Sequence, residues 1–430
     1  MLGEGLSAIH NLKHPVQGFH VIKAGAMHTD DPSPVYLQIS RSARLPDPVK
    51  LARYEKSPEL GPRPLFFSGG TALRSFCAEL IRYTHNSIHL ITPFDSGGSS
   101  AKLREAFHMP AVGDIRNRLM ALAEQSFQGN PEIFELFAHR MAEKAPHSHL
   151  HSELIHMARG KHPLTARIPS PMRPIICSHL QAFLEQMPEN FDLQGASIGN
   201  LVLAAAYLNH RRLFDPAIYT FSGLVQARGI VRPVVNQYRH LVAELASGEV
   251  RVGQHRLTGK ETTPITAPVS RLYLLEPSST ARPASVQIQS RVRDLIRSAE
   301  LICYSMGSFY SSLIANLLPK GVGEAVSSLE CPKIYVPNTG TDPESRGLDP
   351  NRQTEILLSY LKADGPERIE NRQVLTAVLV DRERGNYAAP VDVGRLSALG
   401  VGVIDYPLIT ETSAPLIDPG RLAEVLLSLT

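Results

Sequence analysis

The chain has 430 residues, of which 43% are hydrophobic and 20% are charged, and its net charge at pH 7 is +3. A chain of this length and composition can bury one large core or two smaller ones. Because positive and negative charges nearly balance and no long Lys/Arg block occurs, the sequence excludes a dedicated nucleic-acid surface, and we expect no nucleic-acid partner.

Membrane and secretory signals are missing from the sequence. No apolar run approaches the roughly 18 residues of a membrane helix, and the N-terminus lacks the apolar centre of a signal peptide. The cysteines are far apart and form no Cys-x-x-Cys pair, which argues against a disulfide framework and a cysteine zinc site. We therefore expect a cytoplasmic protein with no membrane partner and with reduced thiols at Cys77, Cys177, Cys303 and Cys331.

Residues 1–60 are predicted to be an irregular N-terminal extension. Prolines break any periodicity at Asp31-Pro32-Ser33-Pro34 and again at Pro46-Asp47-Pro48. We predict that the main domain comprises residues 61–430.

The main domain begins with a pattern typical of parallel sheets. A short apolar strand, Leu65–Phe67, is followed by a glycine turn, a helix with Leu73, Phe76, Leu80 and Ile81 on one face, and a second strand, Ile88–Thr92. The sequence therefore predicts an α/β, Rossmann-like three-layer fold with a mostly parallel sheet. Further strands are predicted at Leu301–Tyr304, Lys333–Val336, Val374–Val380 and Val401–Ile404, with helices at Tyr310–Leu318 and Arg421–Leu427.

Two segments interrupt this pattern. A helical insert is predicted at about residues 131–195, with Ile133, Phe134, Leu136 and Phe137 forming an amphipathic run. Residues 251–277 alternate as edge strands do.

Three glycine- and serine-rich loops follow predicted strands, after Phe67, Thr92 and Tyr304. In an open parallel sheet the carboxyl ends of the strands share one rim, where ligands bind. We therefore expect the three loops to meet at one site although about 240 residues separate the outer two. Small residues and helix N-termini suit a phosphate-bearing ligand.

The loop after Thr92 is the richest in candidate groups. Asp95 is a suitable oxygen ligand for Mg²⁺, and both it and Asp114 are candidate catalytic residues. The alternative is an Asx turn with serines that bind nothing. The candidate ligand-binding residues here are Ser96, Gly97, Gly98, Ser99, Ser100, Lys102, Gly113, Arg116 and Asn117.

The other loops add further candidates, each with a purely structural alternative. The first turn either binds phosphate or only joins a strand to a helix, and the loop after Tyr304 is either an anion site or a serine-rich helix cap. The candidates are Gly69, Gly70 and Thr71 in the first turn, Gly307, Ser308 and Ser311 after Tyr304, and Gly199, Asn200 and Asn338 elsewhere.

Two other patterns carry less weight. Gly195-x-Ser197-x-Gly199 matches a hydrolase nucleophile elbow, but a polar segment precedes it and no histidine follows His255. The histidines His147, His149 and His151 suggest a metal site, but a solvated helix explains them better.

Together the motifs resemble the CofD-like family, which comprises 2-phospho-L-lactate transferase and the gluconeogenesis factors. The resemblance runs from about Leu65 to the C-terminus, and the loops look more like those of the gluconeogenesis-factor branch. It rests on Ser68-Gly69-Gly70-Thr71, Phe94-Asp95-Ser96-Gly97-Gly98-Ser99-Ser100, Gly113-Asp114-Ile115-Arg116-Asn117, Ser197-Ile198-Gly199-Asn200-Leu201, Arg228-Gly229, Gly307-Ser308 and Asn338.

The resemblance leaves three functions open. The first is binding of a nucleotide or nucleotide-diphospho ligand, of GDP- or UDP-sugar type, with a regulatory or metabolic role. The second is Mg²⁺-dependent transfer of a 2-phospholactate-like group from a guanylylated donor to an alcohol. The third is a scaffold that has lost its ligand, which the altered turn Ser305-Met306 favours. A homodimer stays open, and no covalent cofactor is expected.

Overall fold

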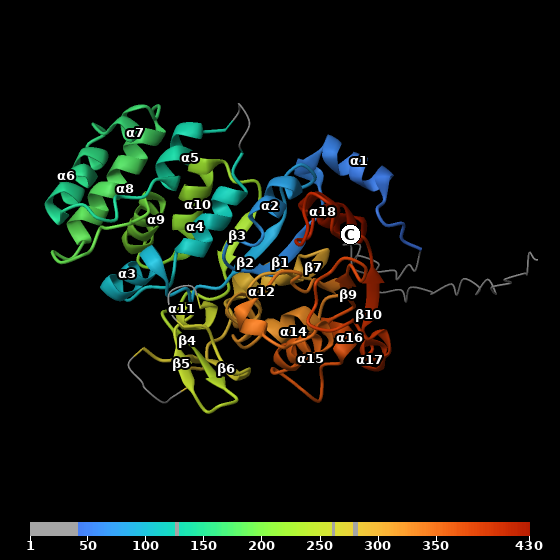
Figure 1. The fold of residues 1–430 in the computed structure, drawn as a ribbon. Coiled ribbons are helices and arrows are strands. Elements are labelled where there is room, and N and C mark those ends of the chain that lie inside the picture. Colours follow the sequence, from blue (N-terminus) through green and yellow to red (C-terminus); the bar gives the residue numbers. More distant parts are fainter. Residues whose placement is uncertain (1–41, 125–128, 260–262, 278–282) are drawn as a thin grey trace, which may run out of the picture. The chain divides into compact units, whose positions relative to one another are not determined.

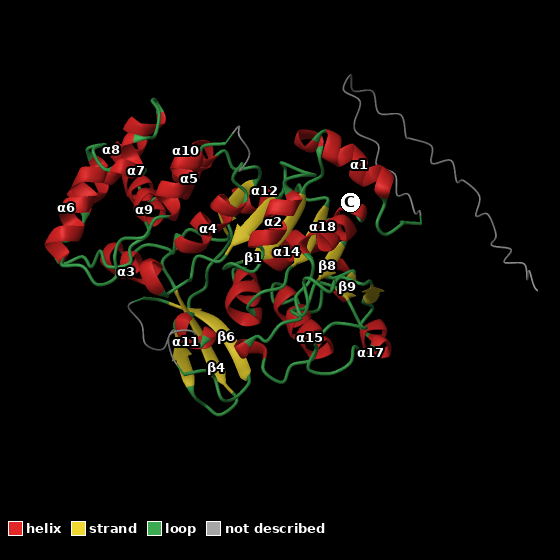
Figure 2. Ribbon diagram, turned by 45° about the horizontal axis from the view of Figure 1, so that its top comes forward, coloured by secondary structure: helices red, strands yellow, loops and turns green. Residues whose placement is uncertain are grey.

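The computed structural model describes residues 42–124, 129–259, 263–277 and 283–430. Its compact unit, Ala43–Thr430, is built around a seven-stranded sheet in the order β10-β9-β8-β7-β1-β2-β3, shown in Figures 1 and 2. Every neighbouring pair is parallel. The strands are β1 (Pro64–Ser68), β2 (Ile88–Ile91), β3 (Ile230–Pro233), β7 (Leu301–Tyr304), β8 (Lys333–Tyr335), β9 (Ala377–Val380) and β10 (Gly402–Asp405).

Alternate residues of each strand face opposite helical layers. Phe66 packs in one core with α2 (Arg74–Leu80) and α18 (Pro419–Ser428). Its neighbours Leu65 and Phe67 belong to the other core, with α12 (Ser290–Arg297), α14 (Val322–Ser327) and α15 (Pro350–Leu361). Because both faces are covered, the central strands β1 and β7 are buried along their whole length and are mostly apolar. The predicted three-layer α/β fold is confirmed.

Most predicted strands lie where the sequence placed them, with two differences. The predicted strand Val374–Val380 begins only at Ala377, because α16 (Asn371–Val374), capped by Glu370, occupies its start. Strand β3 was not predicted. It is an edge strand that contains Arg232 and ends at Pro233, and proline, which has no N–H to donate, suits an edge.

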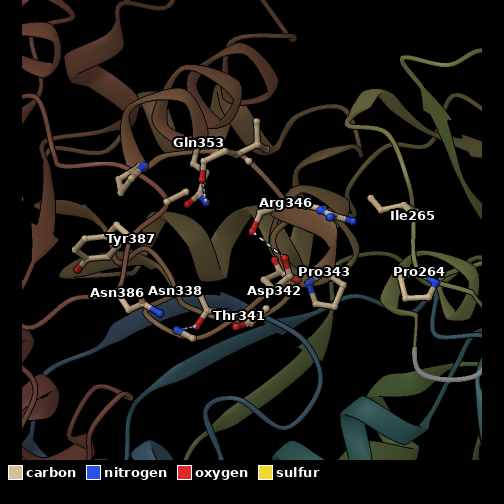
Figure 3. Close-up of a pocket in the computed structure, with 16 residues that line it drawn as sticks. Pro264, Ile265, Asn338, Thr341, Asp342, Pro343, Arg346, Gln353, Asn386 and Tyr387 are labelled. Atoms are coloured by element: carbon tan, nitrogen blue, oxygen red, sulfur yellow. Dashed lines mark hydrogen bonds between the residues drawn. The ribbon is translucent and has the colours of Figure 1, made fainter.

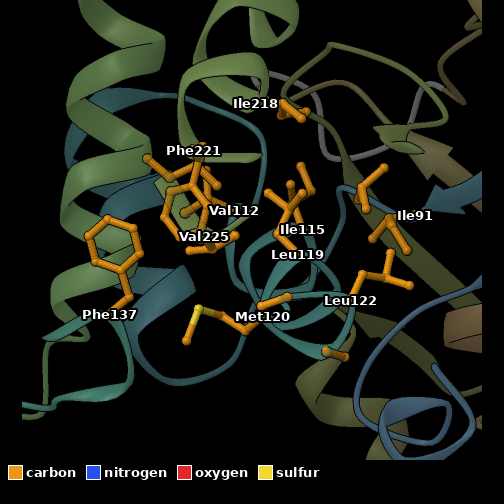
Figure 4. Close-up of a cluster of buried hydrophobic side chains, with 14 of the residues drawn as sticks. Ile91, Val112, Ile115, Leu119, Met120, Leu122, Phe137, Ile218, Phe221 and Val225 are labelled. Atoms are coloured by element: carbon orange, nitrogen blue, oxygen red, sulfur yellow. The ribbon is translucent and has the colours of Figure 1, made fainter. Parts of the chain in front are cut away.

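Helices fill the segment between β2 and β3. They are α3 (Gly98–Phe107), α4 (Gly113–Ala121), α5 (Pro131–Ala138), α6 (His147–Ala158), α7 (Pro163–Ala166), α8 (Met172–Gln186), α9 (Ile198–Asn209) and α10 (Phe214–Val225). The helical region thus continues past the predicted end at residue 195. Figure 4 shows α4 packed against α10, with Ile115 and Leu119 beside Ile218 and Phe221.

A second, antiparallel sheet follows β3. It has the order β5-β4-β6 and consists of β4 (His240–Leu245), β5 (Val250–Val252) and β6 (Val269–Leu275). The predicted edge strands at 251–277 correspond to β5 and β6, but the short helix α11 (His255–Thr258) lies between them. Strand β4 was not predicted.

The segment before β1 is more regular than expected. Residues Pro48–Lys56 form helix α1, with Asp47 accepting hydrogen bonds from the backbone N–H groups of Val49 and Lys50. Only Leu51 of this helix is buried, so its periodicity was too weak to detect. The backbone N–H of Asp47 also donates to Ser428 Oγ of α18, at 2.8 Å. Residues 1–41 of the predicted extension lie outside the described residues. Within the described part of the chain, no helix combines the length and apolar character needed to cross a bilayer.

Candidate functional site

The sheet reverses its strand order at β1. From β1 the chain order runs through β2 and β3 to one edge and through β7, β8, β9 and β10 to the other. Open α/β sheets bind ligands outside the carboxyl ends of the strands at such a switch point. The loops that leave β1 and β7 at this point contain Gly69–Thr71 and Gly307–Ser308.

A cavity of about 680 Å³ lies at these strand ends, and we call it the central cavity. Loops after β1, β2, β7 and β8 all contribute to its wall. Ten of the predicted site residues line it: Gly69, Gly70, Thr71, Asp95, Gly97, Asp114, Asn117, Gly307, Ser308 and Asn338. The structure therefore brings together loops that are more than 200 residues apart in the sequence.

The loop after β1 is packed closely between its neighbours. A methyl group at Gly69 would lie 2.9 Å from Thr92 Cγ2 and 3.0 Å from Ser312 Oγ. Only glycine permits this approach, which holds the loop between the ends of β2 and β7.

Carboxylates dominate the charge of the central cavity. Asp95, Asp114 and Asp342 line it, and none of the described lining residues is a lysine or an arginine. Asp95 Oδ1 accepts a hydrogen bond from the backbone N–H of Gly97 at 3.1 Å, which fixes the turn after β2. Asp114 lies in the first turn of α4 and is 7% exposed.

These carboxylates suit magnesium only if a ligand completes its coordination. Mg²⁺ usually takes one or two carboxylates together with substrate phosphates and water. Within the described residues, no group of three His, Cys, Asp or Glu side chains could hold a metal ion. Asp95 and Asp114 therefore do not form a site made of protein ligands alone, and a magnesium ion held there would need phosphate and water to complete its coordination.

The loop after β7 uses its helix N-terminus for an internal contact. Glu344, which is 1% exposed, accepts hydrogen bonds from the backbone N–H groups of Tyr310 and Ser311 at 3.0 and 2.7 Å, and from the Ser311 hydroxyl. Asp342 accepts from the N–H of Phe309 at 2.9 Å. These residues begin η2 (Phe309–Ile314). The protein's own carboxyl groups thus occupy the place where the sequence suggested an anion.

The two carboxyl groups at this helix hold protons more tightly than usual. Burial, and then the neighbouring charge of Asp342, raise the pKa of Glu344 to about 8. Burial also raises the pKa of Asp342. The backbone N–H groups of 309–311 are engaged, so the part of this loop that faces the cavity is Gly307, Ser308 and Ser312.

The remaining predicted residues lie outside the wall of the central cavity. Lys102 points to the segment after α8, where its Nζ lies 2.6 Å from Asp192 Oδ2. The hydroxyl of Ser99 accepts from the backbone N–H of Ser197 at 3.3 Å. Such contacts position the loops. The predicted residues outside this wall are Ser96, Gly98, Ser99, Ser100, Lys102, Gly113, Arg116, Gly199, Asn200 and Ser311.

The motif at Gly199-Asn200 holds Arg116. Arg116 Nε donates to Asn200 Oδ1 at 3.2 Å. A methyl group at Gly199 would lie 3.2 Å from Arg116 Cγ and 2.8 Å from the carbonyl oxygen of Phe137. These two residues therefore position an arginine of α4 against the helical region.

Sequence reasoning missed the residues that α11 and its N-cap contribute. Gln254, His255 and Thr258 line the central cavity. His255 Nδ1 lies 2.8 Å from Ser96 Oγ, which joins the loop after β2 to α11. No recognised motif surrounds His255, so only the tertiary structure identifies it.

A second pocket, of about 430 Å³, adjoins the central cavity (Figure 3). The two share Asn338, Thr341, Asp342 and Pro343. Its remaining wall includes Arg346, Gln353, Asn386 and Tyr387. The combined space is larger than a diphosphate requires, and its second part offers an aromatic ring and amide groups.

The chain is similar in sequence to known proteins over most of its length. The family model described as 2-phospho-L-lactate transferase CofD matches residues 65–409. A putative gluconeogenesis factor of Thermoanaerobacterium thermosulfurigenes is 29% identical over 377 residues, which cover 86% of this chain and 97% of that protein. The gluconeogenesis factor of Bacillus subtilis (strain 168) is 27% identical over 365 residues, covering 81% of this chain and 92% of its own.

A solved structure shows the same fold. It is a protein of the UPF0052 family from Bacillus halodurans, with a TM-score of 0.61 and 23% identity, and the match covers 85% of this chain and 99% of that one. The family model spans most of the chain and contains every motif loop that lines the central cavity. The prediction drawn from the motifs is therefore confirmed: this chain belongs to the CofD family.

Proposed function

We propose that the protein binds a nucleoside diphosphate, free or as part of a nucleotide sugar, in the central cavity. The observation that carries this proposal is the convergence of four strand-end loops on one cavity at the switch point of the sheet. The backbone N–H groups of Gly69–Thr71 and the Ser308 hydroxyl are the donors for the phosphate oxygens.

The charge of the cavity makes this binding dependent on magnesium. Carboxylates line the wall without a lysine or arginine among the described lining residues, so a diphosphate alone would be repelled. A Mg²⁺ ion held by Asp95 and Asp114 reverses the sign of the local charge. When bound, it would neutralise the phosphate oxygens and fix their position.

The adjoining pocket is suited to the rest of the ligand. The ring of Tyr387 offers a face for a base or sugar, and the side chain of Asn386 offers an amide group (Figure 3).

One observation favours group transfer as a second candidate. The central cavity and the adjoining pocket share a wall, so a nucleotide donor and an acceptor alcohol could lie side by side. In that case Asp95, Asp114 and the metal would stabilise charge on the bridging oxygen of the donor.

Calorimetric titration with UDP, GDP, GTP and UDP-N-acetylglucosamine, each with and without Mg²⁺, tests the proposal. We expect saturable one-to-one binding that requires Mg²⁺. Release of GMP from a guanylylated donor only when an acceptor alcohol is present would establish the transferase. Absence of binding by every ligand would reject both functions in favour of a scaffold.

A further inference from the structure

A second, basic pocket of about 260 Å³ lies beside the central cavity. It shares Gly70, Thr71 and Asn117 with that cavity. Its wall carries four arginines, of which the buried Arg118 already donates to Cys77 Sγ and Ser68 Oγ. We call it the arginine pocket and define it by the other three, Arg74, Arg116 and Arg140.

We propose that the arginine pocket binds the phosphate group of a second small molecule. This goes beyond the proposed function, which places a nucleotide in the central cavity. Arginine suits this task because its planar guanidinium offers paired donors to phosphate oxygens.

The three arginines that define the arginine pocket form no direct ion pair among the described residues, although the charge of Asp114 acts on Arg116. None of the ion pairs between described residues includes Arg74, Arg116 or Arg140. This contrasts with the arginines elsewhere on the surface, many of which pair with Glu or Asp at 2.6–3.9 Å. Three like charges close together repel one another, and a bound dianion would remove that cost.

Arg116 is the fixed donor of this pocket. It is only 8% exposed, and its Nε is held by Asn200 Oδ1 at 3.2 Å. No hydrogen bond between described residues uses its two terminal nitrogens. Because Arg116 lines the wall of the pocket, these two donors are available to the oxygens of an anion.

The environment of Arg116 leaves it charged. Burial, and then the neighbouring charges of Arg140 and Arg74, lower its pKa to about 10. It therefore remains cationic at neutral pH. The side chains of Met120 and Phe134 form apolar parts of the same wall, and such surroundings strengthen a charged contact.

The helical region contributes the third arginine. Arg140 follows α5, and its guanidinium donates to the carbonyl oxygen of Gly195 at 3.1 Å. Arg74 is the first residue of α2 and is exposed. The pocket therefore combines one buried arginine with two accessible arginines that can close on a small anion.

The test uses inorganic phosphate as the probe and the full chain as the protein. Thermal unfolding is followed against phosphate concentration, with chloride replacing phosphate at equal ionic strength. We expect phosphate to stabilise the wild type, and the double variant Arg74→Gln/Arg140→Gln to bind it at least about tenfold more weakly, since the loss of a single charge-assisted contact already has that effect. Arg159→Gln, at an exposed arginine that ends α6, is the matched control and should respond like the wild type.

Titration with UDP and Mg²⁺ separates this inference from the proposed function. We expect the double variant to keep its UDP affinity. Equal loss of UDP and phosphate binding would assign these arginines to the nucleotide cavity and overturn the second site. An equal response of the double variant and the wild type to phosphate would also overturn it. A protein that binds phosphate through these arginines but binds no nucleotide would contradict the proposed function alone.

Discussion

Replacing Gly199 with alanine is expected to destabilise the protein, whereas the same change at Gly223 is expected to stabilise it. Both glycines lie within helices, α9 and α10. A methyl group at Gly199 would lie 2.8 Å from the carbonyl oxygen of Phe137 and 3.2 Å from Arg116 Cγ, but one at Gly223 would meet nothing within 4 Å. Packing therefore opposes the helical preference for alanine only at Gly199.

The expected changes in the free energy of unfolding follow from substitutions of the same two kinds in other proteins. Overpacking a tight contact costs about 1–3 kcal/mol, and Gly→Ala in an unstrained helix gains about 0.4–1 kcal/mol. Urea titration of the wild type and of each variant gives these two changes as differences in the free energy of unfolding. Nucleotide affinity should change little in Gly199→Ala, because Gly199 lies outside the wall of the central cavity. Stabilisation by both alanines would show that the helical region does not pack on α4 as described.

Replacing Asp95 with asparagine is expected to weaken magnesium-dependent nucleotide binding. The change is nearly isosteric, and the amide oxygen can still accept the hydrogen bond from the N–H of Gly97, now at 3.1 Å. What is lost is one charged ligand of a metal that uses only one or two carboxylates. No described arginine or lysine lines the central cavity itself, and the arginines beside it line the arginine pocket, so the metal is the cation that we place on the diphosphate.

Calorimetric titration of UDP with Mg²⁺ should therefore show at least about a tenfold loss of affinity in Asp95→Asn, which corresponds to about 1.4 kcal/mol. Asp192→Asn is the matched control, because that carboxylate pairs with Lys102 on an exposed surface. Retention of full Mg²⁺-dependent binding by Asp95→Asn would remove this residue from the metal site.

The sequence predicted those parts of the fold that depend on local pattern. Strands buried on both faces appear as short apolar runs, which is why β1, β2 and β7 were predicted close to their observed bounds. Strand β3 was not predicted because Arg232 and Pro233, which its edge position tolerates, interrupt the apolar run. Helix α1 was not predicted because it buries only one side chain and so shows little apolar periodicity.

The sequence predicted where the site lies better than it predicted which residues line it. Carboxyl ends of parallel strands share a rim, so the meeting of the motif loops followed from the predicted parallel direction of the strands. Which way a side chain points depends on helix packing. Lys102 on α3 therefore reaches Asp192, and Ser311 reaches Glu344. His255 could not be predicted from the sequence. It lies on α11, 159 residues from Ser96, and only the fold brings the two side chains together.

The crystal structure of the protein with UDP and Mg²⁺ tests the central claim most directly. The account predicts the diphosphate in the central cavity, between Gly69–Thr71 and Gly307–Ser308, with the metal on Asp95 and Asp114. A nucleotide bound elsewhere, for instance among helices α5–α8, with none between the strand-end loops, would contradict it.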